Sequence, residues 1–145
     1  MVTQLKIALD SAVIMYAINS ESLLHLHATK LIADSPIKGY ELHVSELLYL
    51  EVLSFPQIKD EEAREIRDGV AKNVSFNWPI DDEIILKAAQ LRRMYHLKTP
   101  DAIHIATAFA RKCDYFVTND HTLINKKIID GVAIESLTTI QAMIA

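Results

Sequence analysis

The stretch Leu97–Asp120, LKTPDAIHIATAFARKCDYFVTND, constrains the fold of this chain more than any other. Its pattern predicts a helix, a short turn, a buried strand and then an acidic residue. Thr99 is a residue type that caps helices, and Pro100 suits a first helical turn, so we expect the helix to begin here. The apolar residues of Ala102–Phe109 recur at helical spacing. Tyr115–Thr118 is typical of a short buried strand.

Two acids of this stretch lie where α/β proteins do chemistry. Asp101 falls in the first turn of the expected helix, where the positive end of the helix dipole favours a carboxylate. Asp120 directly follows the expected strand. Ligands of open parallel α/β sheets bind at the carboxyl ends of strands. We therefore expect the function to use Asp101 and Asp120, although each has the simpler interpretation of a helix cap.

Strands and helices alternate along the rest of the chain. We expect strands at 5–9, 41–44, 74–78 and 132–135, and helices from 12 onward and at 22–34, 45–55, 60–73, 81–96 and 139–145. Long helices between short strands indicate a central, mostly parallel sheet with helices on both faces. We predict an α/β fold with about 4–5 short strands. All of it belongs to a single domain over residues 1–145.

Composition narrows the classes of function. The formal net charge is −4, whereas a protein that binds nucleic acid through phosphate contacts alone has a basic surface. A nucleic-acid enzyme with this charge would need a metal ion or local basic rims. Cys113 is the single cysteine, which excludes a disulfide framework and a Cys-rich zinc site and fits a cytoplasmic protein. No apolar stretch approaches the roughly 20 residues of a membrane span. Nucleotide-phosphate loops and the GxSxG elbow are also missing.

Two further acids accompany Asp101 and Asp120. Asp10 ends the strand at 5–9, and capping of the next helix and a place in a site explain it equally well. Glu51 lies in the apolar segment ELLYLEVL, where an ionised carboxylate is costly unless it is paired or bound to a cation. Glu46 is the rival of Glu51, but it starts the same helix, where a surface glutamate needs no special explanation.

Three of these acids, Asp10, Asp101 and Asp120, fall at strand or helix ends on one predicted rim of the sheet, and Glu51 comes from a helix near the second strand. Carboxylate oxygens of this kind suit a hard cation, Mg²⁺ or Mn²⁺. His104 follows Asp101 by one helical turn; it is either a packed or surface histidine, the commoner case, or a residue at the rim of the site. Five basic residues flank the central stretch: Arg92, Arg93, Lys98, Lys126 and Lys127. Their side chains are either solvated or hold phosphates beside the acids.

The order of these segments resembles the PIN domain family, specifically the small VapC-type toxins of toxin–antitoxin pairs. LDSAVIMYAI resembles the first motif of that family, and VSELLYLEVL resembles the second, with Glu51 as its glutamate. TPDAIHIATAFARKCDYFVTND resembles the third and fourth motifs and is the most specific part. The chain departs from the pattern at Ala12, where many members have Asn or Ser.

The resemblance implies a Mg²⁺- or Mn²⁺-dependent ribonuclease. It also implies an RNA substrate, an antitoxin protein that blocks the site, and a homodimer. The catalytic and metal-binding residues that it implies are Asp10, Glu51, Asp101 and Asp120. By the same resemblance, Ser11, Thr118 and Asn119 support the acids by hydrogen bonding.

Two alternatives belong to other classes of function. A PIN-like module without catalytic activity would serve as a binding scaffold, and the four acids in this chain argue against it. A receiver-type phosphoacceptor domain would need a paired acid after the first strand and a lysine at a later strand end. Ser11 follows Asp10 instead, and no expected strand ends in lysine.

Overall fold

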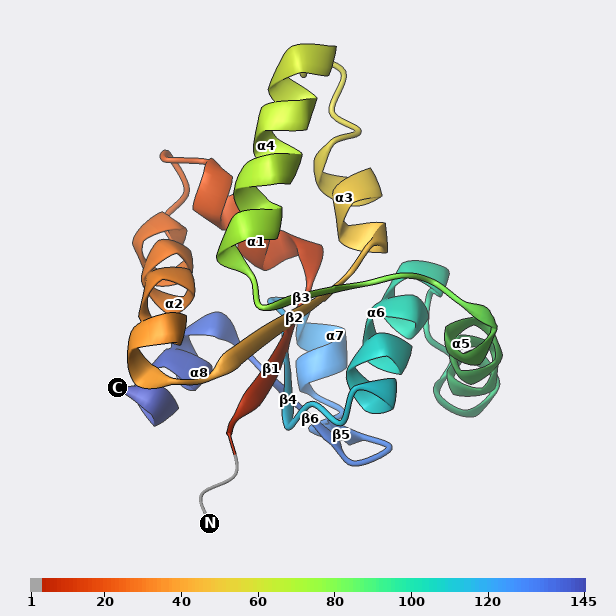
Figure 1. Cartoon of the computed structure of the whole chain (residues 1–145). Coiled ribbons are helices and arrows are strands. Elements are labelled where there is room, and N and C mark those ends of the chain that lie inside the picture. The colour runs from red at the N-terminus through yellow and green to blue at the C-terminus, as the bar shows by residue number, and fades with distance from the viewer. Residues whose placement is uncertain (1–3) are drawn as a thin grey trace.

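The computed structural model describes residues 4–145, in which six strands form one sheet with the order β3-β2-β1-β4-β6-β5 (Figure 1). The strands are β1 Lys6–Leu9, β2 Glu41–Ser45, β3 Phe76–Trp78, β4 Tyr115–Val117, β5 Ile128–Ile129 and β6 Val132–Glu135. Neighbouring strands are parallel except β5 and β6, which are antiparallel. The predicted α/β class and the mostly parallel sheet are confirmed, and the short β5 is the strand that the sequence pattern did not predict.

The helices lie on both faces of this sheet, as predicted (Figure 1). Helices α1, α2 and α8 pack on one face, and α5 and α6 pack on the other, while α4 projects beyond the sheet. Their bounds are α1 Ser11–Ile18, α2 His25–Lys38, α3 Leu47–Val52, α4 Asp60–Asn73, α5 Asp82–Tyr95, α6 Thr99–Ala110, α7 His121–Ile124 and α8 Leu137–Ile144. No helix in the described part of the chain is long and apolar enough to cross a membrane.

The first strand shows why the sheet has a core on each face. Ile7 and Leu9 belong to the cluster that includes α1, α2 and α8, whereas Ala8 between them belongs to the cluster with α5 and α6. Side chains alternate between the two faces of a strand. A slip of one residue would exchange the two sets, so the apolar run of this strand fixes its register.

The end of α2 differs from the sequence-based prediction. The sequence pattern predicted a helix over 22–34, which ends just before Ser35-Pro36, but the helix continues to Lys38 with Pro36 inside it. Proline removes one backbone hydrogen bond, which is a small loss so close to the end of a helix. Gly39 ends the helix in a left-handed conformation with a φ of 77°, which glycine adopts without steric cost.

The predicted cap of α6 is also wrong. The N-cap residue is Lys98, and the Thr99 side chain does not cap the helix, because Thr99 is already its first residue. Pro100 lies in the first turn, as predicted. This start brings Asp101 to the end of α6 that lies beside the carboxyl ends of the strands (Figure 1).

Parallel pairing brings the ends of the central strands together. Leu9 of β1 pairs with Val117 of β4, so the residues that follow each strand are neighbours. The amide of Asp10 donates to the carbonyl of Val117 at 2.9 Å. Residues over one hundred positions apart thus meet at one edge of the sheet.

Candidate active site

Asp10 serves both as a helix cap and as a member of the acidic cluster. One carboxylate oxygen, Oδ1, accepts a hydrogen bond from the Ser11 amide at 2.8 Å. The other, Oδ2, accepts from the Thr118 hydroxyl at 2.7 Å. The two interpretations that the sequence left open are therefore compatible, since capping holds the carboxylate in place at the strand end.

Thr118 links two of the acids through one hydroxyl group. Its side chain is fully buried, and its Oγ1 donates to Asp10 while accepting from the Asp120 amide at 3.1 Å. Asp120 in turn caps α7, because its Oδ1 accepts from the Thr122 amide at 2.8 Å. The loop after β4 is thus fixed by side-chain hydrogen bonds on both sides of Asp120.

The supporting residues implied by the family resemblance differ in what they contact. Thr118 bonds directly to Asp10, and the Ser11 hydroxyl lies at 3.5 Å from Asp10 Oδ1, a long contact beside the shorter bond from the Ser11 amide. Asn119 makes no side-chain hydrogen bond to the acids anywhere in residues 4–145. Its supporting role stays a prediction.

Asp101 is the acid that is most affected by its surroundings. Burial and, to a smaller extent, the nearby negative charges of Asp10 and Asp120 together raise the pKa of its carboxyl to about 6, while His104 and Lys98 oppose the shift. Because like charges disfavour ionisation at close range, this shift indicates that the three aspartates form one electrostatic unit.

Glu51 reaches the same region from α3. Its Oε1 lies 2.5 Å from Nε2 of His104, whose side chain is only 1% exposed. The same nitrogen of His104 is 3.9 Å from Asp10 Oδ1. Glu46, the rival acid, is exposed at the start of α3 and makes no capping bond with its side chain. The structure therefore turns Glu51, and not Glu46, toward the aspartates.

His104 is packed in the core and also contacts the acids, a combination that the sequence did not predict. It is packed, as we expected of an ordinary histidine, and its ring lies 6.3 Å from that of Phe116. It also connects Glu51 to the region of Asp10. The signal was present, because a residue three positions after Asp101 lies on the same side of a helix.

The donor set suits a hard cation, but no three-ligand cage is formed in advance. Within residues 4–145, no group of three or more His, Cys, Asp or Glu side chains is close enough to hold a metal ion. Asp10, Asp120 and Glu51 are each held by a separate hydrogen bond. Carboxylate oxygens with neighbouring negative charge are the donors that Mg²⁺ and Mn²⁺ prefer, and Mg²⁺ usually keeps several of its waters. The chemistry of the residues fits such an ion.

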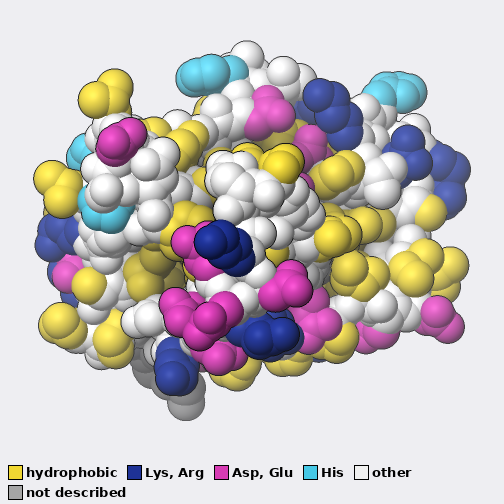
Figure 2. Space-filling model, turned by 90° about the horizontal axis from the view of Figure 1, so that it is seen from above, with side chains coloured by type: hydrophobic (Ala, Val, Ile, Leu, Met, Phe, Trp, Pro, Cys, Tyr) yellow, Lys and Arg dark blue, Asp and Glu magenta, His cyan; other side chains and the backbone are white. Residues whose placement is uncertain are grey.

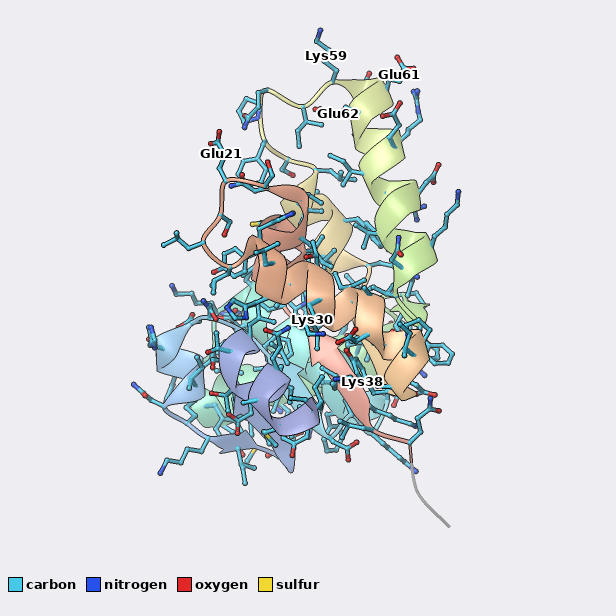
Figure 3. The ribbon with its side chains drawn as sticks, turned by 90° about the vertical axis from the view of Figure 1, so that its left-hand side faces the viewer. Glu21, Lys30, Lys38, Lys59, Glu61 and Glu62 are labelled. Atoms are coloured by element: carbon cyan, nitrogen blue, oxygen red, sulfur yellow. The ribbon has the colours of Figure 1, made fainter. Side chains whose placement is uncertain are left out.

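Charged side chains are unevenly distributed over the upper face of the molecule, seen from above in Figure 2. Acidic side chains with basic side chains between them lie over α4, and a hollow near the opposite edge has acidic and basic side chains at its rim (Figure 2). Glu61 and Glu62 lie at the outer end of α4, far from the sheet (Figure 3). Further basic side chains lie at the right-hand edge, over α5 (Figure 2). A polyanion would therefore be attracted to the basic side chains over α5.

Other residues with possible reactivity have structural roles. Cys113 is buried, and burial raises the pKa of its thiol to about 12, which makes it unreactive. His25 contacts the carbonyl of Tyr16, and His27 contacts Gln141. Cys113 is therefore part of the core.

The sequence from residue 7 to residue 128 matches the model of the PIN domain. The chain belongs to the PIN domain family. A search of curated proteins found no significant match. The predicted family resemblance is confirmed by the match to the family model, which spans most of the chain.

Solved structures share the fold at low sequence identity. VapBC2 from Rickettsia felis, bound to a DNA fragment from its promoter, has a TM-score of 0.68 at 17% identity over 91% of this chain and 98% of that chain. A toxin–antitoxin complex from Klebsiella pneumoniae has a TM-score of 0.62 at 22% identity over 87% and 94%. VapC20 of Mycobacterium tuberculosis, a toxin that cleaves the sarcin–ricin loop, has a TM-score of 0.66 at 14% identity over 88% and 98%.

Proposed function

We propose that this PIN domain protein is a metal-dependent ribonuclease and the toxin of a toxin–antitoxin pair. The observation that carries the proposal is the convergence of Asp10, Asp101 and Asp120, with the pKa of Asp101 raised by burial and by the other two charges. Membership of the PIN family and the shared fold with toxins of toxin–antitoxin complexes support it. Mg²⁺ or Mn²⁺ is the cofactor that the carboxylates favour.

The catalytic residues in this proposal are the acids and the groups that orient them. Asp10, Asp101 and Asp120 would hold the cation, and Glu51 would contribute directly or through water. A bound Mg²⁺ or Mn²⁺ lowers the pKa of a coordinated water and neutralises charge on the phosphate. Thr118 fixes Asp10 relative to Asp120, and His104 fixes Glu51. These contacts reduce the reorganisation needed to assemble the site.

A combined melting and cleavage experiment tests the nuclease proposal. We expect Mg²⁺ or Mn²⁺ to stabilise the protein, by about 2.7 kcal/mol at one hundred times the dissociation constant if the ion binds only the folded chain. The same ions should support hydrolysis of RNA, and the variant Asp10→Asn should show neither effect. If neither ion shifts the melting temperature and RNA stays intact, the chain is a non-catalytic scaffold instead.

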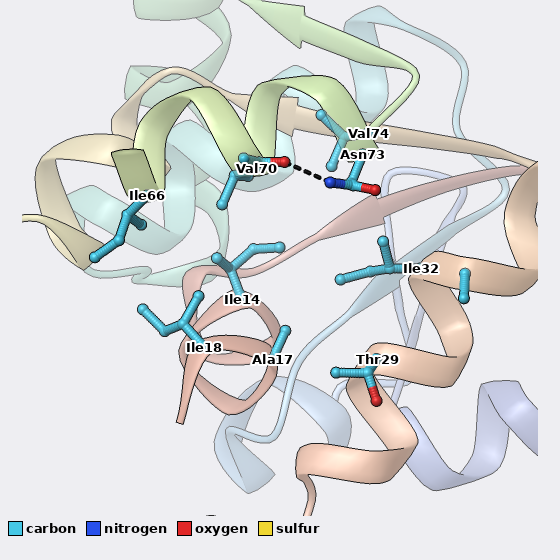
Figure 4. Close-up of a pocket in the computed structure, with 11 residues that line it drawn as sticks. Ile14, Ala17, Ile18, Thr29, Ile32, Ile66, Val70, Asn73 and Val74 are labelled. Carbon is cyan, nitrogen blue, oxygen red and sulfur yellow. Dashed lines mark hydrogen bonds between the residues drawn. The ribbon is translucent and has the colours of Figure 1, made fainter. Parts of the chain in front are cut away.

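An apolar groove offers a place for the antitoxin. A cavity of about 360 Å³ lies between α1, α2 and α4, and its wall includes Ile14, Ile32 and Val70 (Figure 4). On the turn between α1 and α2, Leu23 is 98% exposed. Exposed apolar surface of this kind marks protein interaction sites. Because similar folds were solved within toxin–antitoxin complexes, we assign this groove to an apolar segment of an antitoxin.

Gly69 allows a mild test of this assignment, since it lines the groove and a Cβ added there has no neighbour within 4 Å. The variant Gly69→Glu should keep its fold and its RNA cleavage but lose binding to a co-expressed antitoxin from a neighbouring gene. Gly69→Ala is the matched control, and it should retain binding. Equal antitoxin binding by both variants would place the partner elsewhere.

A further inference from the structure

A second cavity opens directly beside the acidic cluster. It has a volume of about 330 Å³, and the residues that line it include two of the acids, Asp101 and Asp120, and two lysines, Lys98 and Lys126. Sites of about this size are at the small end of the range for small-molecule ligands. We call it the nucleotide cavity. Its combination of acids and lysines is unlike the apolar groove, which is lined by aliphatic side chains.

The nucleotide cavity has an apolar floor and a fixed aromatic wall. Leu97 and Leu123 line it and are buried, so the floor is built on the core. Tyr95 also lines it, and its hydroxyl donates to Asp130, which is held by Lys87. A tyrosine anchored in this way presents a ring of defined orientation, and aromatic rings are the usual partners of unstacked bases.

Basic residues continue from this cavity along the end of α5. His96 and Leu97 line both the nucleotide cavity and an adjacent open cavity, which Arg92 and Arg93 also line. Arg92 is oriented by a hydrogen bond from its Nε to the Leu97 carbonyl at 3.2 Å. The exposed side chains that form this basic track are Arg92, Arg93, His96, Lys98 and Lys126.

The lysines and arginines of the basic track are available to a ligand. In residues 4–145, none of them has a carboxylate within ion-pair distance, whereas other lysines, such as Lys87 and Lys30, are paired. A protein with net charge −4 that keeps cations unpaired beside its acids has a local surface for anions. The acidic end of α4 lies on the other side of the molecule's upper face (Figure 2).

We infer that the nucleotide cavity binds one nucleotide of single-stranded RNA next to the cleavage site, and that the basic track binds the phosphates that follow. This inference rests on the proposed function for the identity of the ligand. Lys98 and Lys126 neutralise the phosphate nearest to the acids. Arg92 and Arg93 guide the strand away along α5. A duplex cannot offer an unstacked nucleotide to the cavity, so the inference specifies single strands.

Metal-free binding of a short labelled RNA tests this inference without cleavage. The probe is a fluorescent single-stranded octanucleotide, measured by anisotropy with a chelator present. The double variant Lys98→Ala/Lys126→Ala should bind about tenfold more weakly or worse. The slope of log affinity against log salt should fall by about 0.7 for each lost phosphate contact. In cleavage assays with metal, the same variant should raise KM more than it lowers kcat.

The double variant Lys59→Ala/Lys127→Ala is the matched control, because it removes the same charge outside the cavity. Lys59 lies at the far end of α4 (Figure 3), and Lys127 is the neighbour of Lys126 but does not line the cavity. Equal loss of affinity in the two double variants would overturn the inference, as would equal affinity of the parent protein for single-stranded and duplex RNA. A parent protein that binds RNA through Lys98 and Lys126 but never cleaves it would overturn the proposed function alone.

Discussion

Two buried histidines of this protein each contact a glutamate, yet their second ring nitrogens have different surroundings. Nε2 of His43 lies 2.9 Å from Glu41, and Nε2 of His104 lies 2.5 Å from Glu51. Nδ1 of His43 accepts a hydrogen bond from the indole N–H of Trp78 at 2.9 Å. Nδ1 of His104 is buried without a hydrogen-bond partner in residues 4–145. Only His43 has all of its ring nitrogens satisfied.

The two histidine rings also pack against different neighbours. His43 stacks on Phe76 and Trp78, with ring centroids at 4.8 and 6.1 Å, and the guanidinium of Arg111 lies 3.8 Å from the centre of the Trp78 ring. His104 instead lies beside the acidic cluster, 3.9 Å from Asp10. A buried polar group normally has its hydrogen-bond partners. We infer from the comparison that His43, satisfied and within an aromatic stack, stabilises the fold, whereas His104, beside acids and with one ring nitrogen that has no partner in the described residues, belongs to the proposed site.

The largest expected effect separates the two glutamates. Glu51→Gln should reduce RNA cleavage by about a hundredfold or more, because several kcal/mol of charge stabilisation depend on the cation held at this site. Glu41→Gln should leave cleavage within about twofold, since Glu41 contacts His43 and lies away from the acids. Steady-state kinetics on one RNA substrate, with folding checked by circular dichroism, measures both.

Glu46→Gln is the control on the same helix as Glu51. Glu46 is exposed, so its loss should cost only a few tenths of a kcal/mol in stability and leave cleavage unchanged. Loss of cleavage in Glu46→Gln, with normal cleavage in Glu51→Gln, would mean that the second motif was assigned five residues too late.

The second-largest expected effect is a loss of RNA cleavage on substitution of His104, which substitution of His43 should not cause. His104→Gln should lower RNA cleavage by about 10–100-fold, the usual range for a residue that orients a metal ligand. His43→Gln should keep the activity of the folded protein but lower its stability by about 1–3 kcal/mol, because Trp78 and Glu41 lose a buried partner. Activity per folded molecule and the midpoint of urea unfolding separate the two results. A His104→Gln variant with full activity would remove His104 from the site.

The fold and the acids could largely be predicted from the sequence because they rest on local patterns. Apolar strands that end in an acid, and the helical spacing of Ala102–Phe109, indicate a parallel sheet with acids at its carboxyl edge. The parallel pairing of β1 with β4 then brings Asp10 close to Asp120. Glu51 could be chosen over Glu46 because a carboxylate within an apolar run needs a partner.

The features that the sequence did not reveal depend on contacts between distant segments. The partner of Glu51 is His104, which lies 53 positions away, so its role emerges only when α3 and α6 pack together. Helix α2 continues past Pro36 and ends at Gly39, because the hydrogen bond of this left-handed cap can compensate for the bond that proline removes in the last turn. The nucleotide cavity likewise forms only where α5, α6 and α7 meet.

A smaller effect concerns the charge of Asp101 in the metal-free protein. Its pKa rises from 3.8 to about 6 on folding, so the ionised form destabilises the native state above pH 6. Asp101→Asn should therefore raise the stability at pH 7.5 by up to about 3 kcal/mol. This gain should vanish as the pH falls from about 6 toward 4, where Asp101 of the parent protein becomes protonated. Thermal melts in a chelator across this range measure the effect.

Asp68→Asn is the matched control for Asp101→Asn, because Asp68 is exposed on α4. It should show no comparable gain at any pH. RNA cleavage by Asp101→Asn should be lost while its fold is kept. An unfolded Asp101→Asn protein would instead identify Asp101 as a structural residue at the start of α6.

The smallest effect is a change in fluorescence that reports on the satisfied histidine. Trp78 is the only tryptophan, and its indole N–H donates to the unprotonated Nδ1 of His43. Burial lowers the pKa of His43 below 6.5, with weaker contributions from the positive charges of Lys6 and Arg111, and Glu41 opposes the shift. The unfolded chain takes up a proton near pH 6.5 and the folded chain only at lower pH, so this residue reduces stability as the pH falls below 6.5. Tryptophan emission should therefore stay constant through pH 6.5 and change at more acidic pH, when protonation of Nδ1 breaks the bond from Trp78.

The two histidine variants are the controls for this fluorescence transition. The variant His43→Gln should lack the transition, while His104→Gln should keep it. A transition centred at or above pH 6.5 in the parent protein would contradict the buried, neutral state of His43.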